Sequence, residues 1–314
     1  MIKVITLFLL GLFLVIKGGD WFVDSSIKIA KLSGLPQIFI GATIVSIATT
    51  LPELIVSITA TLQNQTIMAV GNGIGSIICN TGLILSLNCI IGKVIIDDNE
   101  YTIKYFFLLC SVSALFAFGM DNRICFTESI ILFFGFIFYI CYNLKVISKI
   151  HITKSKEKIR ISKNLYKIIL FFVFGISFIT LGSNLIINNG IKLAEILNVP
   201  SSIISLTLIS LGTSLPELVT CISSLIKKNA EIGIGNIIGA NILNCLLVIG
   251  TSGLLKELYI VPHNITVDIP IALILTFILS ISLFTKKICK AQGLFMLCIY
   301  LSYIILSWNN VVNP

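Results

Sequence analysis

The chain has 314 residues, of which 56% are hydrophobic and only 11% are charged. A typical soluble domain is about 25% charged, so this composition excludes a soluble protein and indicates a polytopic membrane protein. The formal net charge of +8 does not indicate a nucleic-acid partner, because the basic residues lie beside apolar stretches that are long enough to enter a bilayer.

Ten stretches of the chain have the length and composition of membrane-spanning helices, each of which needs about 20 apolar residues. We predict spans at residues 3–27, 37–61, 67–91, 102–119, 125–146, 166–187, 201–225, 232–254, 266–284 and 291–309. The first stretch is interpreted as a span because no small-residue cleavage site follows it. The fold class is therefore an all-α polytopic membrane protein with ten transmembrane helices.

Lys and Arg residues are distributed unequally between the two sides of these spans. Successive loops, with the adjoining span ends, lie on opposite sides of the membrane. Counted in this way, one side carries 17 Lys and Arg residues and the other carries 4. The positive-inside rule places the richer side in the cytoplasm, which predicts a multi-pass protein of the cell membrane with both termini on the non-cytoplasmic side. Residues 147–165, with five Lys and one Arg, are predicted to be a solvated basic cytoplasmic linker.

A six-residue phrase occurs twice in the chain. ATTLPE at residues 48–53 returns as GTSLPE at residues 212–217, an offset of 164, and the same offset relates Asn80 to Asn244. The chain therefore divides into two five-span repeats, residues 1–146 and 166–314. Five is an odd number, so the second repeat has the inverted orientation that is typical of secondary transporters. The proline in each phrase predicts a broken helix near the membrane midplane.

Only two acidic residues lie deep within the predicted spans, Glu53 and Glu217. Ionisable residues at such depth are costly and mark ion pathways. Polar residues at helical spacing share their faces, and carbonyls freed by the prolines near Ser46 and Ser210 add oxygen ligands. Asn72 and Asn236 fit either a ligand role or a bridge between helices. The predicted metal-ion ligands are Glu53, Glu217, Thr50, Ser214, Ser46, Thr49, Ser210, Thr213, Ser76, Asn80, Asn244, Asn72 and Asn236.

These ligands are all oxygen donors, which suit hard cations such as Na⁺ and Ca²⁺. Two carboxylates balance one Ca²⁺ or two Na⁺, which gives a physical basis for competition between the ions. No cluster of Cys and His residues indicates zinc, and no cofactor is expected. The expected partners are the transported ions and the lipid bilayer, with no obligate protein partner.

The two phrases and their surroundings resemble the α-repeats of the cation/calcium exchanger superfamily, particularly its sodium/calcium exchanger branch. The matching segments are residues 41–53 with 71–80, and residues 205–217 with 233–244. The resemblance implies ten spans, alternating access and exchange of Ca²⁺ against Na⁺. It places Glu53 and Glu217 at the central Ca²⁺ position.

The same resemblance implies that further oxygens complete the Na⁺ and Ca²⁺ sites. They are the side chains of Thr50, Ser76 and Ser214 and the backbone at Ser46 and Ser210. The chain departs from the family pattern at Ala240, where Ser is usual, and at Asn244, where some relatives have Asp.

Three other interpretations remain open at this point. A proton/calcium antiporter would use the same carboxylates, with protons displacing Ca²⁺. A cation channel is less compatible with two interrupted helices around a compact acidic site. A membrane scaffold without transport activity has no need for buried acids. We therefore predict a secondary active antiporter rather than an enzyme, a channel or a scaffold.

Overall fold

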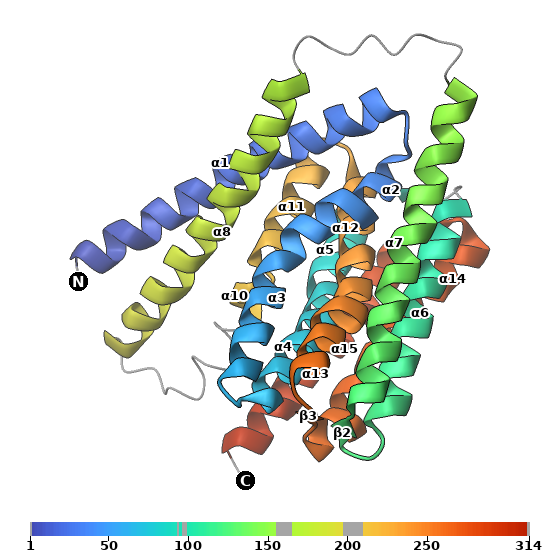
Figure 1. Cartoon of the computed structure of the whole chain (residues 1–314). Helices are drawn as coiled ribbons and strands as arrows, with labels where there is room; N and C mark the ends of the chain where they lie inside the picture. Colours follow the sequence, from blue (N-terminus) through green and yellow to red (C-terminus); the bar gives the residue numbers. More distant parts are fainter. Residues whose placement is uncertain (1, 93, 96–98, 155–164, 197–209, 313–314) are drawn as a thin grey trace.

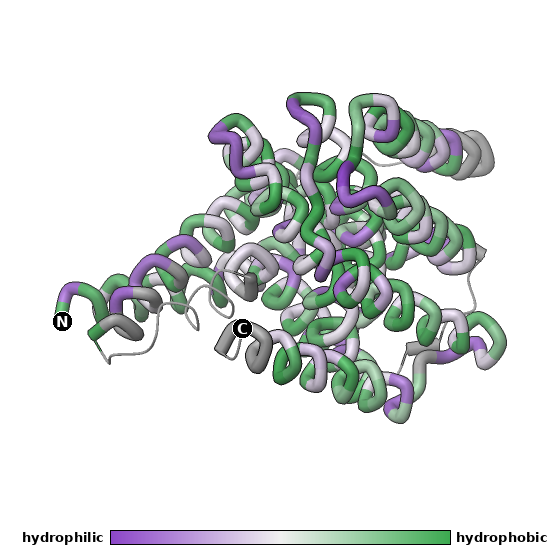
Figure 2. The backbone as a smooth tube through the Cα atoms, turned by 90° about the horizontal axis from the view of Figure 1, so that it is seen from below, coloured by the Kyte–Doolittle hydropathy of each residue, from purple (hydrophilic) through white to green (hydrophobic). Residues whose placement is uncertain are grey.

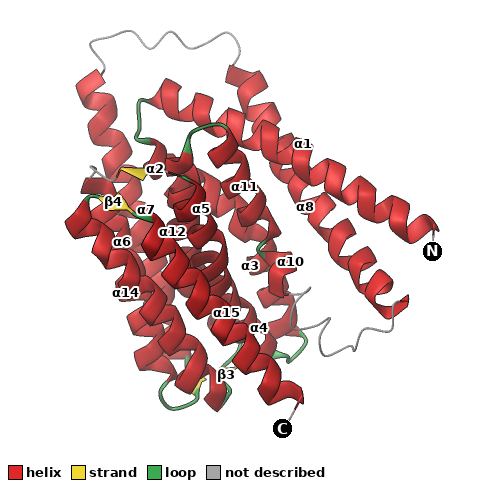
Figure 3. Cartoon of the chain, turned by 180° about the vertical axis from the view of Figure 1, so that it is seen from behind, coloured by secondary structure: helices red, strands yellow, loops and turns green. Residues whose placement is uncertain are grey.

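A computed structural model describes residues 2–92, 94–95, 99–154, 165–196 and 210–312, and these residues are nearly all helical (Figures 1 and 3). The first half contains α1 (Ile2–Ser33), α2 (Gln37–Ile40), η1 (Gly41–Val45), α3 (Ser46–Leu62), α4 (Thr66–Cys79), η2 (Asn80–Leu85), α5 (Ser86–Ile91), β1 (Val94–Ile95), α6 (Asn99–Gly119), β2 (Arg123–Ile124) and α7 (Phe126–Lys154), where η marks a π-helical segment.

The second half has a closely similar order of elements. It contains α8 (Leu165–Ile196), α10 (Ser210–Thr213), α11 (Leu215–Ile226), α12 (Ala230–Leu243), η4 (Asn244–Ile249), α13 (Gly250–Leu255), β3 (Leu258–Tyr259), η5 (Asn264–Asp268), α14 (Ile269–Thr285), β4 (Lys287–Ile288) and α15 (Lys290–Val312). The bounds of α4, η2 and α5 reappear 164 residues later as those of α12, η4 and α13.

Nine helical segments in the described part of the chain are long and apolar enough to cross a membrane. They correspond to nine of the ten predicted spans. The remaining span, predicted at 201–225, is described only from Ser210 onward, as α10 and the apolar helix α11. Residues 201–209 lie outside the described residues. The all-helical membrane fold is confirmed, and the count of ten stays a prediction.

The predicted linker, 147–165, is partly helical. The last helix of the first half, α7, continues to Lys154, eight residues beyond the predicted span, and α8 begins at Leu165. Residues 155–164 lie outside the described part of the chain.

Two short antiparallel ladders join the halves at opposite ends of the bundle (Figure 3). In one, β1 of the first half pairs with β4 of the second, with Val94 opposite Ile288. In the other, β2 pairs with β3, with Arg123 opposite Tyr259. At the repeat offset of 164 residues, β1 corresponds to β3 and β2 corresponds to β4. Each ladder is therefore the repeat counterpart of the other. This exchange of ends is the arrangement expected of inverted repeats.

The centre of the bundle is α12, in which every residue from Ile232 to Leu243 is buried. Outer helices instead expose apolar side chains, such as Phe13 of α1 and Phe277 of α14, which are 56% and 58% exposed. Figure 2 shows hydrophobic residues along most of the helical backbone. An apolar exterior of this kind faces hydrocarbon rather than water.

The first helix of each half packs against the other, and the pair α1 and α8 lies obliquely across the bundle (Figure 1). Glycines allow their backbones to approach closely. A Cβ added to Gly182 would lie 2.7 Å from the Gly11 carbonyl oxygen, and one added to Gly18 would lie 2.7 Å from the Gly175 carbonyl oxygen. Small residues at such positions are the usual basis of helix association in membranes.

We therefore expect Gly182→Ala to destabilise the protein by about 1–3 kcal/mol, because the added methyl forces α1 and α8 apart. Gly190→Ala is the matched control. Its Cβ would meet only Phe8 at 3.7 Å, so Ala's better helix propensity should leave stability unchanged or improve it slightly. The midpoint of thermal unfolding of the purified protein checks both, and equal midpoints for the two variants would contradict the close contact.

Candidate cation site

The helix that carries Glu53 is widened rather than broken. The segment α2–η1–α3 is continuous from Gln37 to Leu62, and Pro52 lies inside α3. The sequence predicts a break at Pro52, whereas the irregularity in the structure is the π-helical segment Gly41–Val45, one turn before Ser46. A proline removes one helical hydrogen bond, yet α3 runs through Pro52 as a helix and packs against α4 and α12.

The equivalent helix of the second half is interrupted as predicted. The helix α10 ends at Thr213, Ser214 forms a turn, and α11 begins at Leu215. Pro216 lies in the first turn of α11, where its missing N–H costs no helical bond. Glu217 lies in the same turn, at the positive end of the helix dipole. The two half-sites therefore present their carboxylates on different backbone geometries.

Both carboxylates are fully buried, at 0% exposure, and they lie close enough to repel one another. Within the described residues, none of their four oxygens accepts a hydrogen bond of good geometry, and no Lys or Arg pairs with them. The Thr49 hydroxyl also lies near Glu217, but it donates to Asn236 Oδ1 at 3.0 Å. Buried anions without a partner are strongly destabilising, so this pair fits a bound cation.

Five neutral side chains around the carboxylates also hold unpartnered oxygens, and all five are at least 98% buried. These oxygens, unpaired within the described residues, belong to Thr50, Ser76, Asn80, Ser214 and Asn244. Buried polar atoms normally have hydrogen-bond partners. These five are among the ligands predicted from the sequence, and with the carboxylates they make nine acceptor oxygens, compared with the six to eight that Ca²⁺ takes. The Thr220 hydroxyl, on α11 three residues after Glu217, is also buried and unpartnered among the described residues, and it is not one of the ligands predicted from the sequence.

Other predicted ligands direct their side chains elsewhere. Ser46 Oγ donates to the Thr43 carbonyl at 3.1 Å. Asn72 donates to the Glu53 backbone carbonyl at 3.2 Å and to Ser57 Oγ at 2.9 Å. These bonds favour the helix-bridging alternative for Asn72, and the Thr49 bond does the same for Asn236.

Two further predicted ligands contribute less to this picture. Thr213 is half-buried at the end of α10. Ser210 begins α10, and its side chain lies outside what the structure describes.

One supporting residue escapes the sequence analysis. Asn241 of α12 is fully buried and accepts a hydrogen bond from Asn80 Nδ2 at 3.0 Å, while its own amide donates to Thr81 Oγ1 at 2.7 Å. The first of these hydrogen bonds occupies the amide nitrogen of Asn80, whereas its amide oxygen stays unpaired among the described residues. Because the repeat counterpart of Asn241 is Ile77, comparison of the two halves hides it. The sequence feature that could reveal Asn241 is its position within a predicted span, three residues before Asn244.

The two halves also differ at the position of Ser76. Its repeat counterpart is Ala240, which is fully buried on α12 and offers only a methyl group. Next to it, Gly239 lets α12 approach the backbone of η1, since an added Cβ would lie 2.6 Å from the Ala42 carbonyl oxygen. The glycines of this region therefore serve close helix packing.

The donor set determines which ions the arrangement can hold. Within the described residues, no three or more His, Cys, Asp or Glu side chains are grouped so that they could hold a metal ion. Two carboxylates with hydroxyl and amide oxygens instead suit Na⁺ or Ca²⁺. The buried pair and its five neutral neighbours form what we call the central site.

Comparison with known proteins gives consistent matches along the whole chain. The family model described as sodium/calcium exchanger protein matches residues 3–145 and again 167–309. The uncharacterized membrane protein MJ0091 of Methanocaldococcus jannaschii is 32% identical over 297 residues, which cover 94% of each chain. The sodium/calcium exchanger MaX1 of Methanosarcina acetivorans is 27% identical, covering 95% of this chain and 96% of its own. The solved structure of the sodium-calcium exchanger NCX_Mj superposes with a TM-score of 0.86 at 28% identity, covering 97% of this chain and 98% of the other.

The contacts of Asn241 generate a prediction about the central site. Asn241→Ile installs the residue of the other repeat and frees the Asn80 amide to turn its nitrogen toward the cation. We expect Ca²⁺ binding to weaken by about tenfold, the loss of one uncompensated neutral ligand. Equilibrium binding of ⁴⁵Ca²⁺ to the purified protein measures this.

Two further variants show whether Asn241 acts through Asn80. In an Asn80→Ala background, Asn241→Ile should add almost nothing, since coupled residues are not additive. The control is Asn189→Ala, which removes a buried amide that bonds within its own helix at 2.8 Å. Independent, additive losses at positions 80 and 241 would contradict the link.

Proposed function

The chain belongs to the sodium/calcium exchanger protein family and is a Na⁺/Ca²⁺ antiporter; from this premise we propose that Glu53 and Glu217 bind the two ions in turn at the central site. The observation that supports this assignment is the pair of fully buried carboxylates without hydrogen-bond donors or basic partners among the described residues. Their combined charge of −2 is balanced by one Ca²⁺ or two Na⁺. Either one Ca²⁺ or two Na⁺ therefore neutralises the pair, so the two ions compete for the same carboxylates.

The position of the site supports exchange by alternating access. One carboxylate comes from each half of the chain, and the halves have inverted orientations. A rearrangement of one half against the other therefore has a counterpart, related by the pseudo-two-fold axis in the membrane plane, that opens the site toward the opposite face. In this proposal the unpartnered hydroxyls and amides hold Na⁺, which needs oxygen ligands beyond the carboxylates.

We also propose that both termini face the non-cytoplasmic side. The loops predicted to be cytoplasmic meet at one end of the bundle, where β1 pairs with β4 and Gly92 lies beside Leu225. Lys227 and Lys287 lie at this end, whereas Arg123 lies in the ladder at the opposite end. The basic side is the cytoplasmic side by the positive-inside rule.

Transport into proteoliposomes tests the coupling ion. We expect an outward Na⁺ gradient to drive ⁴⁵Ca²⁺ uptake, because Na⁺ leaving the site makes it available to Ca²⁺ from outside. K⁺ or H⁺ gradients alone should give only the background of empty vesicles. Uptake driven by pH in Na⁺-free buffer would instead support the proton/calcium antiporter, and uptake without any counter-ion gradient would support a channel.

Removing one carboxylate charge tests the site. Glu53→Gln and Glu217→Gln keep the side-chain shape but leave one negative charge for a divalent ion. We expect each to lower Na⁺-driven ⁴⁵Ca²⁺ uptake by at least about 100-fold, the scale of losing a buried charge partner. Glu257→Gln, at an acid that is 40% exposed, is the control and should transport normally. Uptake near the control level by either purified, folded variant would remove that residue from the site.

A further inference from the structure

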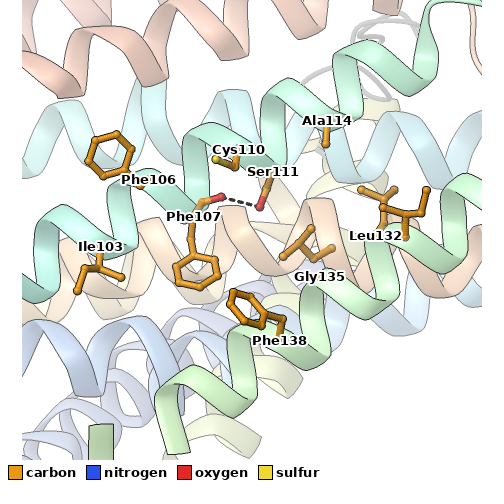
Figure 4. Close-up of a pocket in the computed structure, with 11 residues that line it drawn as sticks. Ile103, Phe106, Phe107, Cys110, Ser111, Ala114, Leu132, Gly135 and Phe138 are labelled. Carbon is orange, nitrogen blue, oxygen red and sulfur yellow. Dashed lines mark hydrogen bonds between the residues drawn. The ribbon is translucent and has the colours of Figure 1, made fainter. Parts of the chain in front are cut away.

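An apolar groove of about 460 Å³ lies between α6 and α7, away from the central site (Figure 4). Its walls include Phe107 and Phe138, whose ring centroids are 5.9 Å apart. Phe106 and Ile131, which also line it, are each 52% exposed. The groove therefore opens on the outer surface of two membrane-spanning helices, where the surrounding medium is lipid.

Small residues create the depth of this groove. Gly135 on α7 has no side chain, and a Cβ added there would lie 3.2 Å from Leu246 Cδ2. On α6, Ala114 has only a methyl side chain. Leu246 contributes to the lining, and it belongs to η4, the segment that begins at Asn244 of the central site. A molecule in the groove therefore touches the element that carries a candidate ion ligand.

The interior of the groove is almost entirely apolar. Ser111 supplies its hydroxyl, and this hydroxyl already donates to the Phe107 carbonyl oxygen at 2.7 Å (Figure 4). The remaining described lining residues are apolar apart from Cys110. What enters is therefore a hydrocarbon chain rather than a polar molecule.

The length of the groove matches one leaflet of the bilayer. Along α6 it runs from Ile103 to Ala114, eleven residues that rise about 16 Å at 1.5 Å per residue. Half of the hydrocarbon core of a bilayer is about 15 Å thick. A single acyl chain that enters from one head-group region fills this span.

A cationic side chain lies beyond one end of the groove. Lys145 is exposed and follows Phe138 by seven residues, which places it on the same face of α7 two turns further along. The acid at this end of α6, Glu100, accepts a hydrogen bond from Tyr142 at 3.3 Å. The Lys145 ammonium therefore lies where the head group of a lipid in the groove would be, and its charge favours an anionic phosphate.

We propose that the α6–α7 groove binds one acyl chain of an anionic phospholipid, with the phosphate at Lys145, and that this lipid supports transport through Leu246 and η4. The lipid-binding part stands on the groove and on Lys145 and does not depend on the proposed function. Its effect on transport rests on the proposed function.

Photolabelling tests the binding. The purified protein is reconstituted with phosphatidylglycerol or phosphatidylcholine that carries a diazirine in its acyl chain, and labelled peptides are mapped by mass spectrometry. We expect labelling concentrated on residues 103–114 and 131–138, about fivefold stronger for phosphatidylglycerol, the contribution of one Lys near an anionic lipid. Lys145→Gln should abolish this preference. Lys290→Gln, an exposed Lys at the start of α15, should retain it.

A variant that fills the groove with a side chain tests whether lipid binding affects transport. Ala114→Phe adds a ring from the half-buried lipid-facing side and should remove the labelling. Wild-type ⁴⁵Ca²⁺ uptake should fall when phosphatidylglycerol is omitted, and uptake by Ala114→Phe should be the same in both lipids.

Equal labelling of the groove and of the outer faces of α14 and α15 would overturn the binding site, as would a preference that survives Lys145→Gln. Equal wild-type uptake in both lipids would overturn the effect on transport. Absence of Na⁺-driven uptake in every lipid would contradict the proposed function, whereas the labelling result would still decide the binding site.

Discussion

The structure is organised around two carboxylates that lie in an apolar bundle without a protein counter-charge among the described residues. Burial of one such group is expensive, and burial of two adds their mutual repulsion. The surrounding helices do not reduce this cost with Lys or Arg. Neutral oxygens that also lack hydrogen-bond partners among the described residues accompany the two carboxylates. A cation bound between the carboxylates would offset both costs, which is the physical basis of the proposed ion site.

Much of this arrangement follows from the sequence because membrane proteins obey few and strong rules. Span length and charge asymmetry between loops predict nine of the helices, since hydrocarbon tolerates little else. The predicted bounds lie within three residues of the observed ones except at the C-terminal ends of α1, α7 and α8, which extend six to nine residues further. The depth of Glu53 and Glu217 in apolar sequence predicts the centre of the site. Polar residues within spans are few, so the sequence also selects five neutral residues whose oxygens are unpartnered among the described residues, but it does not select Thr220.

The features that the sequence does not predict depend on local backbone geometry and on contacts between distant helices. Pro52 and Pro216 have the same neighbours in sequence, yet only the second coincides with an interrupted helix. Because the phrases around the two prolines are nearly identical, the local sequence pattern does not reveal this difference. Asn241 was missed for a related reason. Its role depends on a contact across 161 residues that the repeat does not duplicate. The sequence repeat therefore reveals the polar residues that both halves share, but not a residue such as Asn241 that occurs in one half only.

The π-helical segments η2 and η4 carry information about the history of this chain. A π segment corresponds to one extra residue inserted into an α-helix, and here the insertion begins at Asn80 and again at Asn244. Two independent insertions at equivalent positions require a coincidence, whereas one insertion in a single ancestral half, copied later, requires none. The widened turn is then older than the duplication, and Ala240 and Asn241 record divergence after it.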